Sequence, residues 1–129
     1  MILNLTQHPA TPEQIAAGVV DLQDDQLAGI KTLLTFEQLP TRQEIEERAF
    51  LIVRLAFANA LGADMDEDPM PSRAMIGGAP FLMSALESAL LDECITPIYA
   101  FSVRDSVEQT QPDGSVRKIN VFKHVGFVQ

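Results

Sequence analysis

One short segment near the end of the chain, Gln111-Pro112-Asp113-Gly114, constrains the fold of this sequence more than any other. Proline fixes φ, aspartate stabilises the bend and glycine adopts a positive φ, so the segment reverses the chain tightly. The runs on either side, 98–109 and 115–127, have a period of two. We therefore predict an antiparallel hairpin whose three-residue loop, with a glycine bulge, pairs Gln111 with Ser115.

Counting back from this loop gives the register of the hairpin, and a slip of one residue would mix its two faces. The expected cross-strand pairs are Glu108 with Lys118, Ser106 with Asn120, Arg104 with Phe122, and Ser102 with His124. All but one of these residues are polar, and they share the even-numbered face. The odd-numbered face is mainly apolar, with Asp105 and Lys123 interrupting Tyr99, Phe101, Val103, Val107, Ile119, Val121, Val125 and Phe127.

Upstream of the hairpin, short apolar runs alternate with helix signals. Residues 2–5, 19–20 and 74–76 have the character of buried strands. The segments 11–14 and 41–44 each begin a helix with a threonine cap, Asp24 or Asp25 caps another helix, and Pro80 begins the last. This order predicts one domain over residues 1–129: an α/β, small Rossmann-like, three-layer fold with parallel central strands and the C-terminal antiparallel β-hairpin.

Two further features bear on packing. The segment Ala49–Leu61 is apolar on nearly all sides apart from Arg54, so it is buried either in the core or against another subunit. Cys94 is the single cysteine, which excludes an internal disulfide, and we expect it to be a small buried residue after a helix end.

The distribution of charge limits the partners. The net charge is −9, and residues 1–95 carry five basic and fifteen acidic side chains, whereas residues 96–129 carry four basic and three acidic ones. The negative electrostatic field of such a chain repels long nucleic acids and anionic membranes. A small anionic ligand in a local pocket is still allowed, provided that the last quarter of the chain helps to bind it. The start of the chain lacks the pattern of a signal peptide and no apolar run is long enough to span a membrane, so we expect a cytoplasmic protein.

Candidate binding residues follow the expected strands, because ligands of open α/β sheets bind beyond the carboxyl ends of the strands. The first strand leads into Thr6, Gln7 and His8; the strand at 74–76 leads into Gly77, Gly78 and a helix start; the hairpin brings Ser102, Arg104 and His124. Glycines before a helix expose N–H groups to a phosphate, arginine suits phosphate, and histidine can move a proton.

Each candidate also has a purely structural interpretation. The glycines suit any tight turn, Thr6 and Gln7 can satisfy backbone groups, and His8 can cap the turn before Pro9. Arg104 can pair with Asp105 or Glu108 on the surface, and His124 can be a hydrogen-bonded histidine of the sheet.

Metal and cofactor patterns are weak in this sequence. Asp64-x-Asp66-x-Asp68 begins like a calcium loop, but Pro69 stands where the sharp turn needs glycine and Met75 stands where a bidentate glutamate is needed. We therefore predict no metal site and no cofactor.

Two stretches resemble the small stand-alone members of the CARF-like (CRISPR-associated Rossmann fold) group, the ring nucleases associated with type III CRISPR systems. The first strand with Thr6-x-His8 and Thr11-x-x-Gln14 is similar to their opening segment. The segments 95–100, Ser102-x-Arg104, 113–118 and 122–127 are similar to their closing hairpin. Gln7-His8-Pro9 and the acidic insert around Asp64–Asp68 depart from that pattern.

The resemblance implies a homodimer whose cleft binds a cyclic oligoadenylate and slowly cleaves it without metal, by in-line attack of a ribose 2′-hydroxyl. Thr6 and His8 would then line the cleft, while Arg104 and His124 would contact phosphate or assist proton transfer. Two alternatives stay open. One is an accessory protein that dimerises or binds a protein partner through the apolar helix 49–61. The other is an unrelated nucleotide- or phosphate-metabolising enzyme that needs a divalent metal.

Overall fold

The computed structural model describes residues 1–61 and 71–129, and in these ranges the chain forms one five-stranded sheet with four helices. The elements are β1 (Ile2–Asn4), α1 (Pro12–Ala16), β2 (Val19–Asp21), α2 (Asp24–Leu34), α3 (Arg42–Leu61), β3 (Arg73–Met75), α4 (Pro80–Asp92), β4 (Thr96–Thr110) and β5 (Val116–Val128). The strand order is β2-β1-β3-β4-β5, with β1 to β4 parallel and β5 antiparallel to β4. The predicted α/β fold is confirmed. The stretch Asp64–Asp68 lies outside the described residues.

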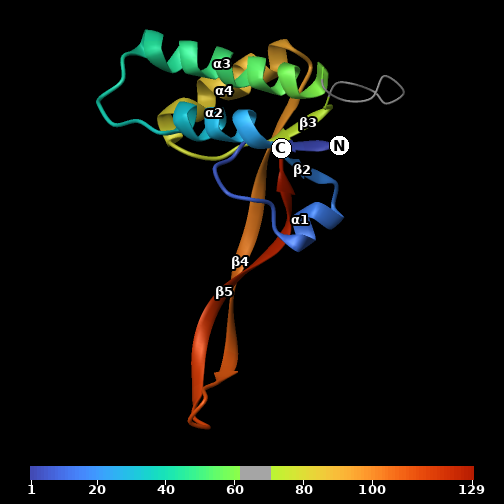
Figure 1. Ribbon diagram of the computed structural model, residues 1–129, viewed down its shortest axis with the longest axis vertical. Coiled ribbons are helices and arrows are strands. Elements are labelled where there is room, and N and C mark those ends of the chain that lie inside the picture. Colours follow the sequence, from blue (N-terminus) through green and yellow to red (C-terminus); the bar gives the residue numbers. More distant parts are fainter. Residues whose placement is uncertain (62–70) are drawn as a thin grey trace.

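The strand order decides which helix lies on which face of the sheet. The chain moves from β1 to β2 in one direction and from β2 to β3 and β4 in the other. Because such crossovers are right-handed, the two directions place their helices on opposite faces. Helices α2, α3 and α4 pack on one face, and the loop before α1 packs on the other through Ala10 (Figure 1).

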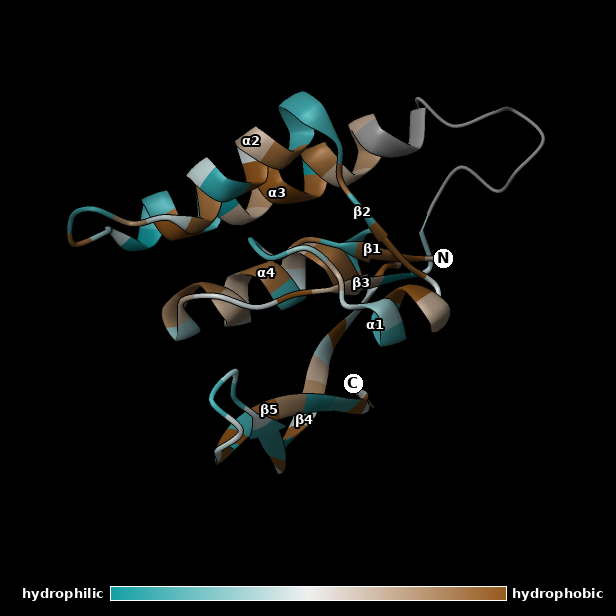
Figure 2. Ribbon diagram, turned by 60° about the horizontal axis from the view of Figure 1, so that its bottom comes forward, coloured by the Kyte–Doolittle hydropathy of each residue, from teal (hydrophilic) through white to brown (hydrophobic). Residues whose placement is uncertain are grey.

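Most of the core lies between the sheet and the three longer helices. Leu3 and Leu5 of the β1 segment belong to the same buried cluster as side chains of α2, α3 and α4. Figure 2 shows the hydrophobic colouring of the ribbon concentrated on these helices and the short strands. Over residues 42–58, helix α3 contributes four buried residues to this core: Ala49, Ile52, Val53 and Ala56. Of the two interpretations of the segment 49–61, the structure therefore supports burial in the core. Phe50 and Leu51 point outwards and are 59% and 44% exposed.

The register of the C-terminal hairpin follows the sequence prediction. Ser102 pairs with His124, Arg104 with Phe122, Ser106 with Asn120, and Glu108 with Lys118. The loop closes as expected, because the N–H of Gln111 donates to the carbonyl of Ser115 at 2.7 Å and Gly114 has a φ of 85°. The hairpin runs well beyond the helices and forms an arm (Figure 1).

The prediction for Phe127 is wrong, because the register shifts at the base of this arm. Phe101 pairs with Gly126 while Ser102 pairs with His124, so Val125 is an extra residue on β5. Such a β-bulge reverses the alternation of the strand beyond it. Phe127 therefore lies on the same face as His124, with their ring centroids 4.9 Å apart, and packs against the small cluster of Ile2, Val19, Met75 and Ile98.

Capping side chains set several helix ends. Thr11 and Gln14 form a complete capping box at α1, and Thr41 accepts from the N–H of Glu44 at the start of α3. At α2 the N-cap is Gln23, so the expectation of an aspartate cap is wrong.

Arg48 of α3 donates to the carbonyls of Thr32, Leu33 and Thr35 at the end of α2 and lies 4.1 Å from the ring centroid of Phe36. One cation thus joins α2 to α3.

Cys94 is exposed, which contradicts the expectation of a buried residue. It has a φ of 61° directly after α4. Its N–H donates to the carbonyl of Leu91, and the N–H of Ile95 donates to that of Leu90. This is a Schellman motif, in which the left-handed position is most often occupied by glycine. Here that position is Cys94, and its side chain points to solvent.

We expect Cys94→Gly to stabilise the protein by about 1 kcal/mol, because glycine has no Cβ penalty in the left-handed region. Urea unfolding of both proteins measures the difference. Cys94→Ala is the matched control and should leave the stability nearly unchanged. A Cys94→Gly protein less stable than the parent would contradict this account.

Candidate functional site

The carboxyl edge of the sheet holds a cavity of about 470 Å³ between the ends of β1 and β3 and the part of β4 that follows its pairing with β3. Its walls come from the loop after β1, from α1, from the turn after β3 and from the start of the arm. The lining residues are Thr6, Gln7, His8, Pro9, Thr11, Gln14, Met75, Ile76, Gly77, Gly78, Tyr99 and Ala100. Its volume is typical of cavities that bind small ligands. Five of the eight sequence-predicted site residues thus lie around one cavity.

Buried Asn4 determines the shape of the loop after β1. Its amide nitrogen donates to the carbonyl of His8 at 2.8 Å and to Oδ1 of Asp21 at 2.7 Å. Its Oδ1 accepts from the N–H and the hydroxyl of Thr6 at 2.9 and 2.7 Å. All four hydrogen-bonding positions of this amide are therefore used. Asp21 also accepts from the N–H of Ala10, which ties the loop to β2.

This network separates the roles of the loop residues. The Thr6 hydroxyl has one hydrogen, and its shorter contact is to Asn4, so Thr6 positions the loop. His8 is held by its backbone, while its side chain is exposed. The imidazole of His8 is thus available to a ligand at the rim of the cavity.

The turn after β3 forms the opposite wall. Among the hydrogen bonds within residues 1–61 and 71–129, none is donated by the N–H of Gly77 or Gly78. Helix α4 follows directly, with Ala79 at its N-cap and Pro80 at its first position. Free amides together with the positive end of a helix dipole favour an anion. A Cβ at Gly77 would lie 3.7 Å from Cγ2 of Thr6, so the two walls approach closely.

Tyr99 connects the cavity to the helical layer, since it lines the cavity and its hydroxyl donates to the carboxylate of Glu87 on α4. Burial, together with the hydrogen bond and the negative charge of Glu87, raises the pKa of Tyr99 to about 12 from the ordinary 10.0. The fold therefore favours the neutral phenol. The stability that this gives is complete below pH 10 and is lost as the pH rises towards 12.

Tyr99 is the single tyrosine of the chain, so its ionisation can be followed by tyrosinate absorbance. We expect a midpoint near pH 12. Glu87→Gln should lower the pKa of Tyr99, because it removes the carboxylate charge, but burial should keep it above the ordinary value. Glu93→Gln, at the exposed end of α4, is the control and should change nothing. A midpoint near pH 10 for the ionisation of Tyr99 in the wild-type protein would contradict the hydrogen bond between Tyr99 and Glu87.

The arm residues Ser102, Arg104 and His124 do not line this cavity. Ser102 and Arg104 lie two and four residues beyond Ala100 on β4, which corresponds to about 7 and 13 Å. The guanidinium of Arg104 lies 5.7 Å from the ring centroid of Phe122, its cross-strand partner. In the described residues the salt bridges join Arg42 to Glu46 and Arg48 to Glu44, so the ion pair considered for Arg104 is not formed.

His124 lies nearer to the base of the arm than Arg104 does, because it pairs with Ser102. Its ring contacts Phe127, which packs on the same small cluster as Ala10, and the neighbours of Ala10 in the chain line the cavity. Nδ1 of His124 is buried, and no residue of the two described ranges hydrogen-bonds to it. A buried polar atom without a partner is rare and asks for an explanation, such as a bound ligand.

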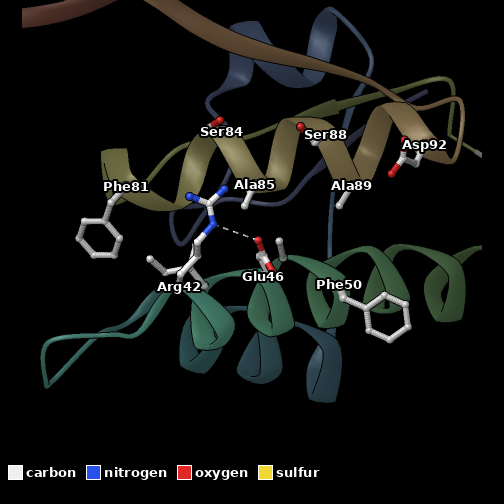
Figure 3. Close-up of a pocket in the computed structure, with 11 residues that line it drawn as sticks. Arg42, Glu46, Phe50, Phe81, Ser84, Ala85, Ser88, Ala89 and Asp92 are labelled. Carbon is white, nitrogen blue, oxygen red and sulfur yellow. Dashed lines mark hydrogen bonds and ion pairs between the residues drawn. The ribbon is translucent and has the colours of Figure 1, made fainter.

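A second cavity, of about 440 Å³, lies between α3 and α4 (Figure 3). Arg42 and Glu46 of α3 form an exposed ion pair there, facing Ser84 and Ser88 of α4. An exposed pair of this kind contributes little binding energy. Because the cavity is away from the strand ends and is lined mostly by exposed side chains, we regard it as a surface groove.

Metal and membrane features can be judged only for the part of the chain that is described. Within it, no three His, Cys, Asp or Glu side chains are grouped to hold a metal ion. In the same ranges no helix has both the length and the apolar character needed to cross a bilayer.

The strand order, the crossovers and the cavity at the strand ends define a small Rossmann-like α/β protein with a ligand-sized cavity at its carboxyl edge. The family model described as the Uncharacterized protein MJ1673 family matches residues 1–128, so the chain belongs to that family. Among curated proteins and among solved structures, no match to the chain was found.

Sequence reasoning missed four residues that shape the cavity: Asn4, Asp21, Glu87 and Tyr99. Asn4 gave a signal, because it is the one polar residue in the buried run Ile2-Leu3-Asn4-Leu5. The contact between Tyr99 and Glu87 joins residues twelve positions apart on two elements, so no local pattern indicated it.

Proposed function

We propose that this protein binds a cyclic oligoadenylate and cleaves it slowly without metal. The observation that carries the proposal is the single cavity shared by the Thr6–His8 loop and the Gly77–Gly78 turn. The similarity of the sequence to CARF-like ring nucleases suggests the ligand. A cyclic oligoadenylate offers both a phosphodiester for free amides and a base for an apolar wall.

The residues have separate proposed roles. The amides of Gly77 and Gly78 and the start of α4 receive a phosphate, which needs close approach of the ligand to the backbone. Gln7 offers an amide to the base or the ribose. Ser102 and Arg104, on the outward polar face of the arm, contact phosphates further along the ring. Thr6 positions the loop rather than the ligand.

The proposed reaction is an in-line transfer within the ligand. The oxygen of a ribose 2′-hydroxyl attacks the adjacent phosphorus, and the bond from phosphorus to the 5′-oxygen breaks. The products are a 2′,3′-cyclic phosphate and a free 5′-hydroxyl. His8 accepts the proton of the 2′-hydroxyl and His124 supplies one to the 5′-oxygen, while the cavity holds the groups in line.

A homodimer completes the proposed site. A ring of several nucleotides is larger than one cavity of about 470 Å³. Arg104 lies beyond the rim of the cavity in its own chain. Two copies related by a two-fold axis would supply two cavities and two arms to one symmetric ligand.

Incubation of the purified protein with cyclic tetra- and hexa-adenylate tests the proposal. Binding should change the fluorescence of Tyr99, and chromatography should show linear products that form equally well in EDTA. His8→Ala should reduce cleavage at least tenfold while the ring still binds. The absence of both binding and cleavage at micromolar protein would overturn the proposal. Cleavage that EDTA abolishes would indicate the metal-dependent alternative.

The exposed Phe50 and Leu51 of α3 support one alternative, an accessory protein that binds a protein partner through this helix. Joint substitution of Arg104 and His124 separates the two functions. An accessory protein would keep both its partner and its melting temperature, whereas the nucleotide-binding protein would lose affinity for the ring.

A further inference from the structure

Gln14 of α1 is deeply buried, yet half of its side-chain amide has no hydrogen-bond partner. It is 8% exposed, and it shares with Asn4 the property of being a buried polar residue. Asn4 uses every hydrogen-bonding position of its amide. In Gln14 the Oε1 accepts from the N–H of Thr11 at 3.0 Å, but no residue within 1–61 and 71–129 accepts a hydrogen bond from the Nε2. Buried polar groups are nearly always hydrogen-bonded, so this nitrogen requires an explanation.

The capping box of α1 fixes the direction in which the amide of Gln14 points. The N–H of Thr11 is a donor, so the atom that it contacts must be the oxygen of the amide, and the nitrogen must lie on the other side. The N–H of Gln14 donates in turn to the hydroxyl of Thr11 at 3.2 Å, so the residue is held by both its backbone and its side chain. Because Gln14 is otherwise buried and lines the cavity at the carboxyl edge, the cavity is the space in which its Nε2 can find a partner.

The other walls of the cavity also supply donors. The amides of Gly77 and Gly78 donate to no residue of the described ranges, and the imidazole of His8 is exposed at the rim. None of the residues that line the cavity, all of which are described, is Asp or Glu, although the chain has 18 acidic residues. A carboxylate would repel an anion and attract a cation, so a lining of this kind suits an oxygen-rich anion such as a phosphate. Gln14 therefore indicates an anion independently of the glycine turn.

We propose that Gln14 is a phosphate-binding residue: its Nε2 donates to one non-bridging oxygen of a phosphodiester, while the amides of Gly77 and Gly78 donate to the other. The inference rests on the proposed function for the identity of the ligand, and it adds the group that holds the phosphate from the side of α1. These donors are neutral, and their orientation is set before the ligand arrives. They can therefore stabilise the negative charge that develops on the phosphate oxygens during in-line attack without first reorienting.

Gln14→Glu separates the donor from the cap. Glutamate also forms a capping box at this position, so the bond from the N–H of Thr11 is kept, but a carboxylate replaces the donor that faces the phosphate. The affinity for cyclic tetra-adenylate, measured by the fluorescence of Tyr99, should fall at least tenfold through charge repulsion. Gln14→Met removes the donor without adding a charge and should weaken binding about tenfold. Gln38→Glu makes the same charge change at an exposed site and should leave the affinity unchanged.

Nuclear magnetic resonance of the isotope-labelled parent protein tests the contact without a nucleotide and without a variant. Millimolar inorganic phosphate should shift the side-chain amide signal of Gln14 together with the N–H signals of Gly77 and Gly78, whereas sodium chloride at the same ionic strength should not. The inference is overturned if phosphate leaves the Gln14 signal unchanged, or if folded Gln14→Glu protein binds the ring as tightly as the parent. Phosphate shifts at all three groups in a protein that does not bind cyclic oligoadenylate would instead contradict the proposed function alone.

Discussion

Asn4→Ala should lower the free energy of unfolding by about 3 kcal/mol, the largest effect that we expect from a single polar substitution in this chain. Asn4 is only 4% exposed, and its amide makes four hydrogen bonds to Thr6, His8 and Asp21. Its removal leaves the N–H of Thr6 and the carbonyl of His8 without these partners. It also leaves the Asp21 carboxylate with one donor fewer at a partly buried site.

Urea unfolding measures this effect, and hydrogen exchange at Thr6 locates it in the loop. Asn4→Asp keeps the side-chain volume but replaces both donors with an acceptor beside Asp21, so it should destabilise the protein to a similar extent. Asn120→Ala, on the exposed face of the arm, is the matched control and should change the stability by less than about 0.5 kcal/mol. A small effect for both Asn4 variants would show that the network does not hold the loop.

Gly77→Ala should reduce the affinity for cyclic tetra-adenylate by roughly ten- to a hundredfold, corresponding to about 1.4 to 3 kcal/mol of lost phosphate contact. The added methyl group would meet Cγ2 of Thr6 at 3.7 Å, an ordinary contact distance, so the fold should tolerate it. It would nevertheless narrow the approach of a ligand to the turn. The loss of affinity should therefore occur without a loss of stability.

Titration of Tyr99 fluorescence with the ring measures this affinity. Gly29→Ala makes the same chemical change on α2, where its Cβ would contact the Leu55 side chain, and should leave the affinity unchanged. Gly78→Ala is unsuitable as a control, because the φ of +144° at Gly78 makes any side chain strained. Equal affinities of Gly77→Ala and the parent would show that the ligand does not contact this turn.

The hairpin illustrates what local sequence can predict and where it stops. The Pro-Asp-Gly turn determined the pairing as far as Ser102 and His124, because each later pair follows from the one before. Beyond that pair the predicted register no longer holds, because Val125 is an extra residue on β5 and Phe101 pairs with Gly126. The bulge forms where β5 leaves the arm and joins the sheet. Counting residues from the turn could therefore not predict on which face of the hairpin Phe127 lies. Similarly, the apolar pattern of α3 could not show which of its sides is buried in the chain's own core, whereas its packing against α2 and α4 places Ala49, Ile52, Val53 and Ala56 there.

The sequence by itself determined the order of the elements, the turn of the hairpin and the strand ends at which candidate residues gather. These depend on local patterns: apolar periodicity, caps and glycines. Only the tertiary structure decided that Thr6, His8, Gly77 and Gly78 share a cavity, that Arg104 lies beyond it and that Asn4 holds its loop. Those facts depend on the parallel pairing of β1 with β2 and β3, which joins residues far apart in the chain. The free energy of such contacts comes from packing and buried hydrogen bonds that form only when the whole sheet is assembled.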